Sequence, residues 1–365
     1  MLKNSMALAA LFALATGAQA QDAPDPAIDR EGKAEVVRTL GDKLRENYVF
    51  PDIAETTAAE LLRRLEAGAY REHTTTRAFA EALRTDLREV GNDLHLQVRY
   101  DPDFREMSQD EATGGPDAEE IAMMEREMAK SAYGIYRTAM LPGGIGYLDV
   151  RFFGPTEFVA PAYESAMQLL AGSRAMIIDL RSNGGGDPSS VAQLASHFFG
   201  KGDERHLNSI YFRPDDSTRA FWTVRSTRSR FTGPLYVVTS DYTFSGGEEF
   251  AYDMQTQKRA TLIGETTGGG ANPGGPVGIG HGLYAFIPSG RAINPVTGTN
   301  WEHVGVVPEH AIEAEQALTL AYRMALEAAA EGASEETDRK RLVELAAGDL
   351  GATPELPRWQ HPREK

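Results

Sequence analysis

Two short apolar runs in the second half of the chain each end in a polar, glycine-rich turn. They read AMIIDLRSNGGGD at residues 175–187 and LYVVTSDYTFSGGEE at residues 235–249. Apolar runs of this length, bounded by turns, are typical of strands that are buried on both faces. From Pro142 onward such runs alternate with stretches of helical spacing, for example residues 158–170 and 248–256. This alternation predicts an α/β domain with the two quoted strands near the middle of its sheet.

The chain before this domain has apolar side chains at helical spacing over residues 33–90. Two breaks, FPD and AGAYREHTTT, divide this region into three expected helices. The sequence LHLQVRY at residues 94–100 alternates apolar and polar positions, which predicts a strand. The next residues are acidic, contain Gly-Gly-Pro, and hold one expected helix near residues 119–130.

These patterns give an expected organisation along the chain. Ala, Leu and Glu dominate from Ala314 onward, which indicates terminal helices. The expected segments are a helical domain at 21–100, an acidic hinge or covering segment at 101–140, the α/β domain at 141–315 and a C-terminal helical tail at 316–365.

The first twenty residues, MLKNSMALAALFALATGAQA, join a lysine to an apolar run and end in Ala-Gln-Ala. This is the layout of a secretory signal peptide with an A-x-A cleavage site. We therefore expect residues 1–20 to be removed during export to a bacterial periplasm or to the medium. The chain contains no cysteine, which excludes disulfides and thiolate nucleophiles and suits an oxidising compartment.

The net charge of the chain excludes one class of partner. It is -16 at pH 7, and nucleic-acid binding needs clustered lysine and arginine to neutralise phosphates. After residue 20 no stretch approaches the roughly 18 apolar residues that a membrane-spanning helix requires. We expect neither a nucleic-acid partner nor stable membrane insertion.

Ser245 follows the second quoted strand and precedes a helical stretch. Residues 245–248 read Ser-Gly-Gly-Glu and fit the capping box, in which Glu248 would accept a hydrogen bond from the backbone at the helix start. A serine at a helix N-terminus could instead be a nucleophile, because the free N–H groups and the helix dipole there favour an oxyanion. The turn differs from the G-x-S-x-G elbow of α/β-hydrolases.

A serine nucleophile also needs a base and donors for the oxyanion. The glycines at 184–186 could supply a second backbone amide. Lys258 lies at the far end of the expected Ser245 helix, which argues against a Ser-Lys dyad. Four of the eight histidines are candidates for the base, and spacing alone does not choose among them: His95, His281, His303 and His310. The order Ser245, Glu265, His303 would match the α/β-hydrolases, but the elbow motif is missing.

Seven blocks occur in the order found in a known enzyme family. Besides the two quoted turns they include DLHLQV, GIGYLDV, RATLIGETTGGGANP, NWEHVGVVPEH and the first helical stretch from RTLGDKLREN to EAGAY. The chain resembles the C-terminal processing (tail-specific) serine peptidase family over about residues 30–315. It is most similar to the branch related to interphotoreceptor retinoid-binding protein and the tricorn core protease.

This resemblance implies a ClpP/crotonase-like ββα catalytic domain, of the α/β (α+β) class, after a small helical bundle. Ser245 would be the nucleophile, and the backbone of Gly246 with that of Gly185 or Gly184 would form the oxyanion hole. The lysine of the tail-specific branch is absent from ETTGGGANP. The resemblance to tricorn instead implies His95 as the base and Glu302 as the group that completes the relay.

Further expectations follow from the resemblance and from the residues. Leu94 occupies the position of a serine in the tricorn-like network, and Glu248 would either cap the helix or support the site from behind. The interval from Tyr100 to Gly143 is too short and acidic for a PDZ domain, so tail specificity is not implied.

We expect a serine peptidase that acts on peptides or unfolded proteins without a metal or cofactor; no oligomeric state is indicated. The alternative is a weakly active or inactive protein on the same scaffold that binds a lipid or a retinoid-like ligand.

Overall fold

The computed structural model describes residues 25–106, 115–350 and 356–364. The expected signal peptide, residues 1–20, lies outside these ranges. Within them, no helix has the length and apolar character needed to cross a membrane. The chain divides into two compact units. The smaller unit contains the chain up to Asp117 with Ile210–Arg219 and Asn272–Ala292, and the larger unit contains Ala118–Ser209, Ala220–Ala271 and Ile293–Lys365.

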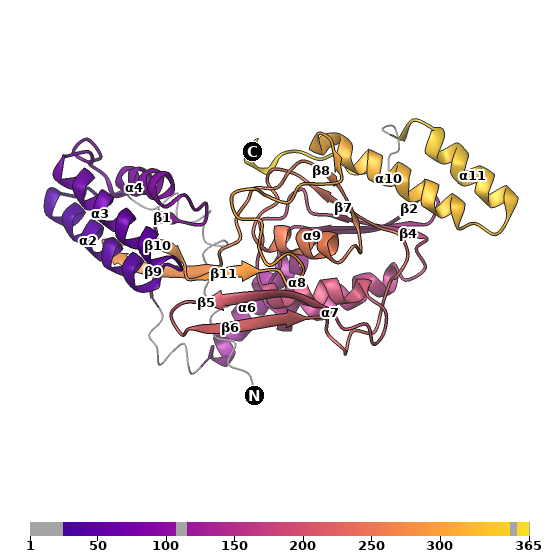
Figure 1. The fold of residues 1–365 in the computed structure, drawn as a ribbon, viewed down its shortest axis with the longest axis horizontal. Helices are drawn as coiled ribbons and strands as arrows, with labels where there is room; N and C mark the ends of the chain where they lie inside the picture. Colours follow the sequence, from indigo (N-terminus) through magenta and orange to yellow (C-terminus); the bar gives the residue numbers. More distant parts are fainter. Residues whose placement is uncertain (1–24, 107–114, 351–355, 365) are drawn as a thin grey trace. The chain divides into compact units, whose positions relative to one another are not determined.

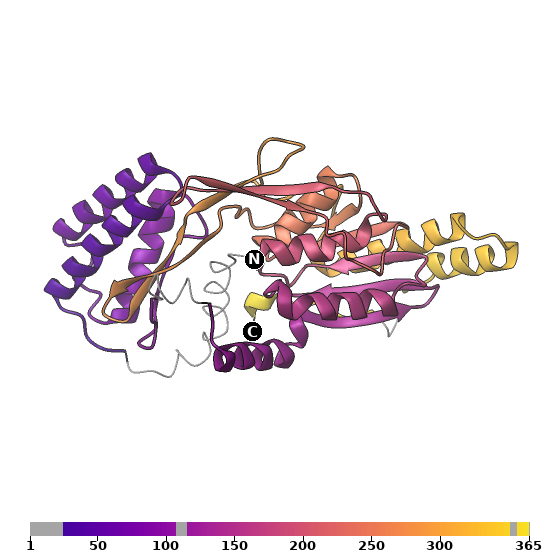
Figure 2. The ribbon, with the colours of Figure 1, turned by 90° about the horizontal axis from the view of Figure 1, so that it is seen from below.

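The three expected N-terminal helices are present in the smaller unit, where they lie side by side (Figures 1 and 2). They are α2 (Arg30–Asn47), α3 (Pro51–Glu66) and α4 (Thr76–Gly91). Side-chain caps begin two of them, because Asp29 accepts a hydrogen bond from the Gly32 amide and Thr75 accepts one from the Ala78 amide. Their inward faces form one apolar core that includes Val36, Leu40, Leu44, Leu61, Leu83 and Leu87.

A three-stranded antiparallel sheet completes the smaller unit. Its order is β1 (Gln97–Tyr100), β10 (Leu283–Pro288) and β9 (Gly274–Gly280), with Val98 opposite Ala285. The sequence analysis placed residues 274–288 in the α/β domain because of their order along the chain. They lie in the smaller unit because β10 pairs with β1, and because Ile279, Leu283 and Ile287 join the core of the helices.

The larger unit is built on a six-stranded sheet of order β12-β8-β7-β4-β3-β2. All neighbouring pairs are parallel except β2 with β3. The two quoted apolar runs form β4 (Ala175–Asp179) and β7 (Leu235–Thr239), which pair at the middle of the sheet and are buried along their whole length. The other strands are β2 (Ile135–Leu141), β3 (Ile145–Val150), β8 (Thr261–Gly264) and β12 (His310–Ala311).

Helices cover this sheet. On one face α10 (Ala314–Glu331) and α11 (Glu336–Ala347) share a core with alternate side chains of the strands, among them Tyr147, Ile177, Val238 and Ile263. The remaining elements are α6 (Ala118–Lys130), α7 (Thr156–Leu169), α8 (Pro188–Ala195) and α9 (Gly246–Thr256), and a three-stranded sheet of order β11-β5-β6 (Gly290–Ile293, His206–Phe212 and Ser217–Trp222) (Figure 1). The mixed α/β class and the N-terminal helices are confirmed. Among the described residues no PDZ domain follows those helices.

Candidate active site

Ser245 occupies an unusual backbone conformation between β7 and α9. Its φ is 52° and its ψ is -119°, whereas the residue before a helix normally has an extended backbone. A positive φ is uncommon for a residue other than glycine, and such strain costs on the order of 1–3 kcal/mol. Strained residues of this kind concentrate at active sites, so the geometry of Ser245 fits a nucleophile better than an ordinary cap.

The glycine turn after β4 packs directly against Ser245. Gly185 has a φ of 107°, and a Cβ added to it would lie 2.7 Å from the Cβ of Ser245 and 3.0 Å from the Gly246 nitrogen. A Cβ on Gly246 would in turn lie 3.0 Å from the Gly186 nitrogen. The two turns therefore meet backbone to backbone, and glycine is required at both contact points.

The amides of the first turn have acceptors within the protein. The Gly185 N–H donates to Asn183 Oδ1 at 2.8 Å, and the Gly184 N–H donates to the Arg151 carbonyl at 3.1 Å. Asn183 is fully buried and donates from Nδ2 to the Val150 carbonyl at 3.0 Å. Gly246, by contrast, is the first residue of α9, where an amide has no acceptor within the helix. An oxyanion role for Gly246 fits this geometry, whereas Gly185 or Gly184 would have to exchange a hydrogen-bond partner.

Glu248 links the start of α9 to the loop after β8. Its Oε2 accepts hydrogen bonds from the Ser245 and Gly270 amides at 2.8 and 2.9 Å. Its Oε1 accepts from Thr267 Oγ1 and from the Gly269 amide, at 2.5 and 2.6 Å. Burial raises the pKa of Glu248 to about 7, although these four donors oppose the rise. Glu248 thus caps the helix and also fixes the loop beside Ser245.

Glu302 is attached to the same loop. Its Oε2 accepts a hydrogen bond from the Ala271 amide, the residue after those bound by Glu248. The neighbouring Trp301 donates from its indole to the Gly270 carbonyl at 2.8 Å and is almost fully buried. Ser245 and Glu302 therefore belong to one network within the larger unit, connected through the residues at 267–271.

The competing arrangement of Ser245, Glu265 and His303 has less support. The Glu265 carboxylate accepts hydrogen bonds from the backbone amides of Asp241 and Ala314, at 3.1 and 3.3 Å. His303 has a φ of 65° and a side chain that is 48% exposed. The Glu265 carboxylate therefore binds two backbone segments. Among the hydrogen bonds of the described residues, none joins Glu265 to His303.

His95 lies in the smaller unit, in the segment between α4 and β1. Its amide donates to Asp93 Oδ1 at 2.9 Å, and its ring stacks on Phe286 with 6.1 Å between centroids and an interplanar angle of 27°. The Oδ2 of Asp93 accepts hydrogen bonds from the Tyr48 hydroxyl at 3.1 Å and from Asn272 Nδ2 at 3.0 Å. Burial lowers the pKa of His95, and the nearby Asp93 carboxylate offsets part of this effect. A neutral imidazole at neutral pH is the form that can act as a base.

Asp93 is a site residue that the sequence analysis did not identify. Its Oδ1 lies 3.9 Å from Nδ1 of His95, and its side chain is buried. The signal was present in GNDLHLQV, where a carboxylate precedes the histidine by two residues. Leu94 is 40% exposed, and its carbonyl accepts a hydrogen bond from Arg88 at 2.8 Å. Asp93 rather than residue 94 therefore supports the backbone of His95.

Two family models match the chain. The model of peptidase family S41 matches residues 144–312, and the model described as the N-terminal domain of this family in eukaryotic IRBP matches residues 29–134. The chain belongs to peptidase family S41. The first range contains Ser245, the glycine turns and Glu302, and the second contains His95 and Asp93.

Individual relatives agree with the S41 assignment. The chain is 28% identical over 188 residues to the chloroplastic carboxyl-terminal-processing peptidase 2 of Arabidopsis thaliana, and this match covers 48% of the chain and 34% of that relative. The chain thus matches about a third of the length of that protein. A putative peptidase from Parabacteroides merdae has a similar structure, with a TM-score of 0.55, 16% identity and coverage of 87% of this chain and 97% of that chain.

The tricorn protease also shares the fold. Its TM-score is 0.52 at 14% identity, with coverage of 87% of this chain and 37% of that chain. At this level of identity the similarity concerns the fold alone. The expected α/β fold with N-terminal helices is therefore confirmed.

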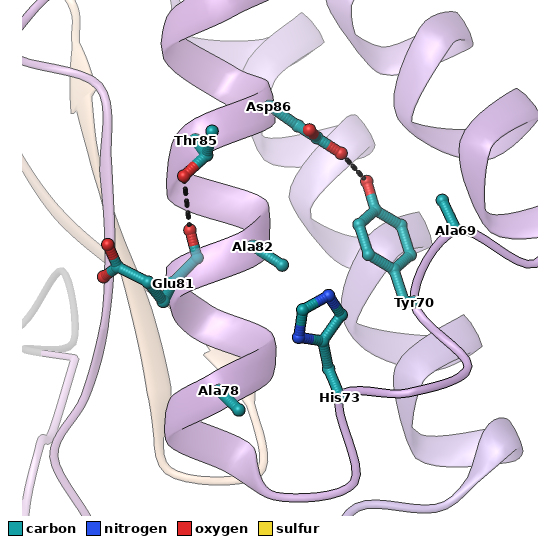
Figure 3. Close-up of a pocket in the computed structure, with 8 residues that line it drawn as sticks. All are labelled: Ala69, Tyr70, His73, Ala78, Glu81, Ala82, Thr85 and Asp86. Carbon is teal, nitrogen blue, oxygen red and sulfur yellow. Dashed lines mark hydrogen bonds between the residues drawn. The ribbon is translucent and has the colours of Figure 1, made fainter.

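The helices of this S41 chain also carry a surface hollow that contains no predicted site residue (Figure 3). Its polar lining is internally paired, since the Tyr70 hydroxyl donates to Asp86 at 2.6 Å and Asp86 also pairs with Arg64 at 2.5 Å. The rest of the lining consists of three alanines with His73, Glu81 and Thr85.

The contact between Gly185 and Ser245 gives a first testable result for this S41 site. We expect Gly185→Ala to lower the rate at which an active-serine phosphonate probe labels the protein by about a hundredfold or more, because the new Cβ displaces the nucleophile. Gly200→Ala is the matched control, since no atom lies within 4 Å of its added Cβ. Thermal unfolding of both variants checks that they fold. Labelling of Gly185→Ala at the control rate would contradict the geometry.

Proposed function

We propose that this chain is a serine-type peptidase whose nucleophile is Ser245. The observation that carries the proposal is the strained backbone of Ser245 at the start of α9, with Gly185 packed against its Cβ. A hydroxyl held at a helix N-terminus beside backbone amides is suited to attack a carbonyl and to stabilise the oxyanion that forms. Membership of peptidase family S41 supports the same reaction class.

The proposed reaction is an acyl transfer in two steps. His95 removes the hydroxyl proton as Ser245 Oγ bonds to the scissile carbonyl carbon, and the Gly246 amide binds the resulting oxyanion. A second amide from Gly185 or Gly184 completes the oxyanion hole. His95 then returns the proton to the leaving amine as the C–N bond breaks, and water hydrolyses the acyl-enzyme by the same route in reverse.

Two carboxylates support this base in the proposal. Asp93 holds the backbone of His95 and lies near Nδ1, where a negative charge stabilises the imidazolium that forms during each step. Glu302 is the predicted third member of the relay, fixed by the Ala271 amide in the larger unit. The mechanism needs no metal or cofactor.

The proposed substrates are peptides or unfolded proteins. In the proposal, the enzyme meets them after its own export. A cleaved signal peptide at residues 1–20 would direct the chain to a periplasm or the medium, in line with the absence of cysteine. Tail specificity is not part of the proposal, because no PDZ domain follows the N-terminal helices in the described chain.

The deciding experiment treats the purified protein with an active-serine phosphonate probe and analyses it by mass spectrometry. We expect one adduct, on the peptide that contains Ser245, together with cleavage of casein. The alternative of a lipid or retinoid-like binding protein makes a different prediction: native mass spectrometry would show a bound apolar ligand and no adduct.

A further inference from the structure

Residues 356–364 contact the glycine turn that follows β4. The indole N–H of Trp359 donates to Ser182 Oγ at 3.0 Å. The ring of Trp359 also lies below the guanidinium of Arg181, with 5.6 Å from Cζ to the ring centroid. Arg181 is itself buried and paired with Asp179, the last residue of β4, at 2.6 Å. Trp359 therefore contacts Arg181 and Ser182, and Ser182 lies three residues before Gly185.

The same segment contacts the turn that carries the nucleophile. His361 Nε2 donates to Asp241 Oδ1 at 2.9 Å, and its ring meets the Tyr242 ring edge to face at 5.9 Å. The Arg363 amide donates to His361 Nδ1 at 3.1 Å, so Nδ1 is the acceptor and Nε2 carries the proton. The Arg363 guanidinium lies 5.6 Å from the Tyr242 ring centroid. His361 thus holds two residues that lie shortly before Ser245.

Trp359 and His361 also contact each other, with 5.6 Å between their ring centroids. The segment therefore bridges the two turns, which are joined beneath it by a hydrogen bond of 2.6 Å from Ser240 Oγ to the Arg181 carbonyl. Tyr242 reaches towards the glycines, since its hydroxyl would lie 3.8 Å from a Cβ on Gly184.

The bridged turns contain Ser245, whose backbone is strained at a φ of 52°, and Gly185, whose φ of 107° favours glycine. A strained backbone persists only where its surroundings fix it. In open α/β sheets, ligands bind in the crevice beyond the carboxyl ends of the strands. We propose that residues 359–363 form a clamp that holds the two turns in register, with Trp359 and His361 as positioning residues. The inference rests on the proposed function, because it concerns alignment of the same nucleophile.

The test compares two double variants of the full-length protein. Trp359→Ala/His361→Ala removes the clamp, and His206→Ala/Trp222→Ala is the matched control, because it removes another tryptophan–histidine pair, stacked at 4.6 Å, from β5 and β6. We expect the clamp variant to lose about tenfold in kcat for a peptide substrate with KM unchanged, the scale of a lost hydrogen bond and ring contacts. The control keeps both values. Trp359→Phe/His361→Gln retains a ring and an N–H donor and should recover most of the loss.

Hydrogen exchange gives a readout that does not depend on catalysis. The amides of residues 181–186 and 240–246 should exchange about tenfold faster in the clamp variant than in the control. Three results would overturn the clamp. Unchanged exchange would mean that the segment does not hold the turns, and a raised kcat would mean that it obstructs the site. A change confined to KM would mean that it contacts the substrate instead. If the wild-type protein has no activity, the proposed function fails, and exchange still decides whether the segment holds the turns.

Discussion

Ser245→Ala should abolish labelling by the phosphonate probe and lower turnover of casein on the order of a millionfold. The expected loss is this large because the hydroxyl forms the covalent bond of the acyl-enzyme, and no other group at the site can replace it. Removal of the hydroxyl should leave the fold intact, since Glu248 continues to accept a hydrogen bond from the backbone amide at 245.

Turnover by the variant and by a control should be measured in parallel. Ser131→Ala is suitable, because Ser131 is exposed at the end of α6 and its hydroxyl only donates to helix carbonyls. Equal turnover by Ser245→Ala and the wild-type protein would refute the proposed nucleophile.

His95→Ala should lower the rate of acylation by about a hundredfold or more. An effect of at least this size is usual when a general base is removed. His281→Ala is the matched control, because His281 also lies in the smaller unit but has an exposed side chain paired with Glu35 at 3.2 Å. An inactive His303→Ala together with an active His95→Ala would instead assign the base to residue 303.

The pH profile provides a second test of His95. Only the neutral imidazole accepts a proton, so activity is lost as the pH falls through the pKa of this group. An ordinary histidine is half protonated at about pH 6.5. Burial lowers the pKa of His95, so the fall in kcat/KM towards acid should begin only at a pH below this value. Asp93 opposes the shift, so Asp93→Asn should move the acid limb to still lower pH. An acid limb at or above the ordinary value in the wild-type protein would contradict the assignment.

Local sequence patterns were sufficient for much of this architecture. The helices α2, α3 and α4 follow from apolar spacing, which acts over a few residues, and from the breaks between them. The central strands β4 and β7 follow from uninterrupted apolar runs between turns. The capping hydrogen bond of Glu248 likewise depends only on the spacing of the capping box.

Features that depend on contacts between distant residues could not be predicted in this way. The hairpin of β9 and β10 belongs to the smaller unit because it pairs with β1, nearly two hundred residues earlier in the chain. The acceptor of the Gly185 amide became visible only with the side chain of Asn183 in place. The position of Asp93 two residues before His95 is readable from GNDLHLQV, but the hydrogen bond that its carboxylate accepts from Asn272, far along the chain, is not.

The pairing of β1 with β10 also has a consequence for biogenesis. His95 is synthesised early, but the sheet beside it remains incomplete until residues 283–288 emerge from the ribosome. By then the segment with Ser245 has already been made. Closing so long a loop is slow compared with forming local helices. A nascent or truncated chain that ends before this hairpin therefore lacks the strand that pairs with β1 beside His95, so the proposed base gains its final surroundings only late in synthesis.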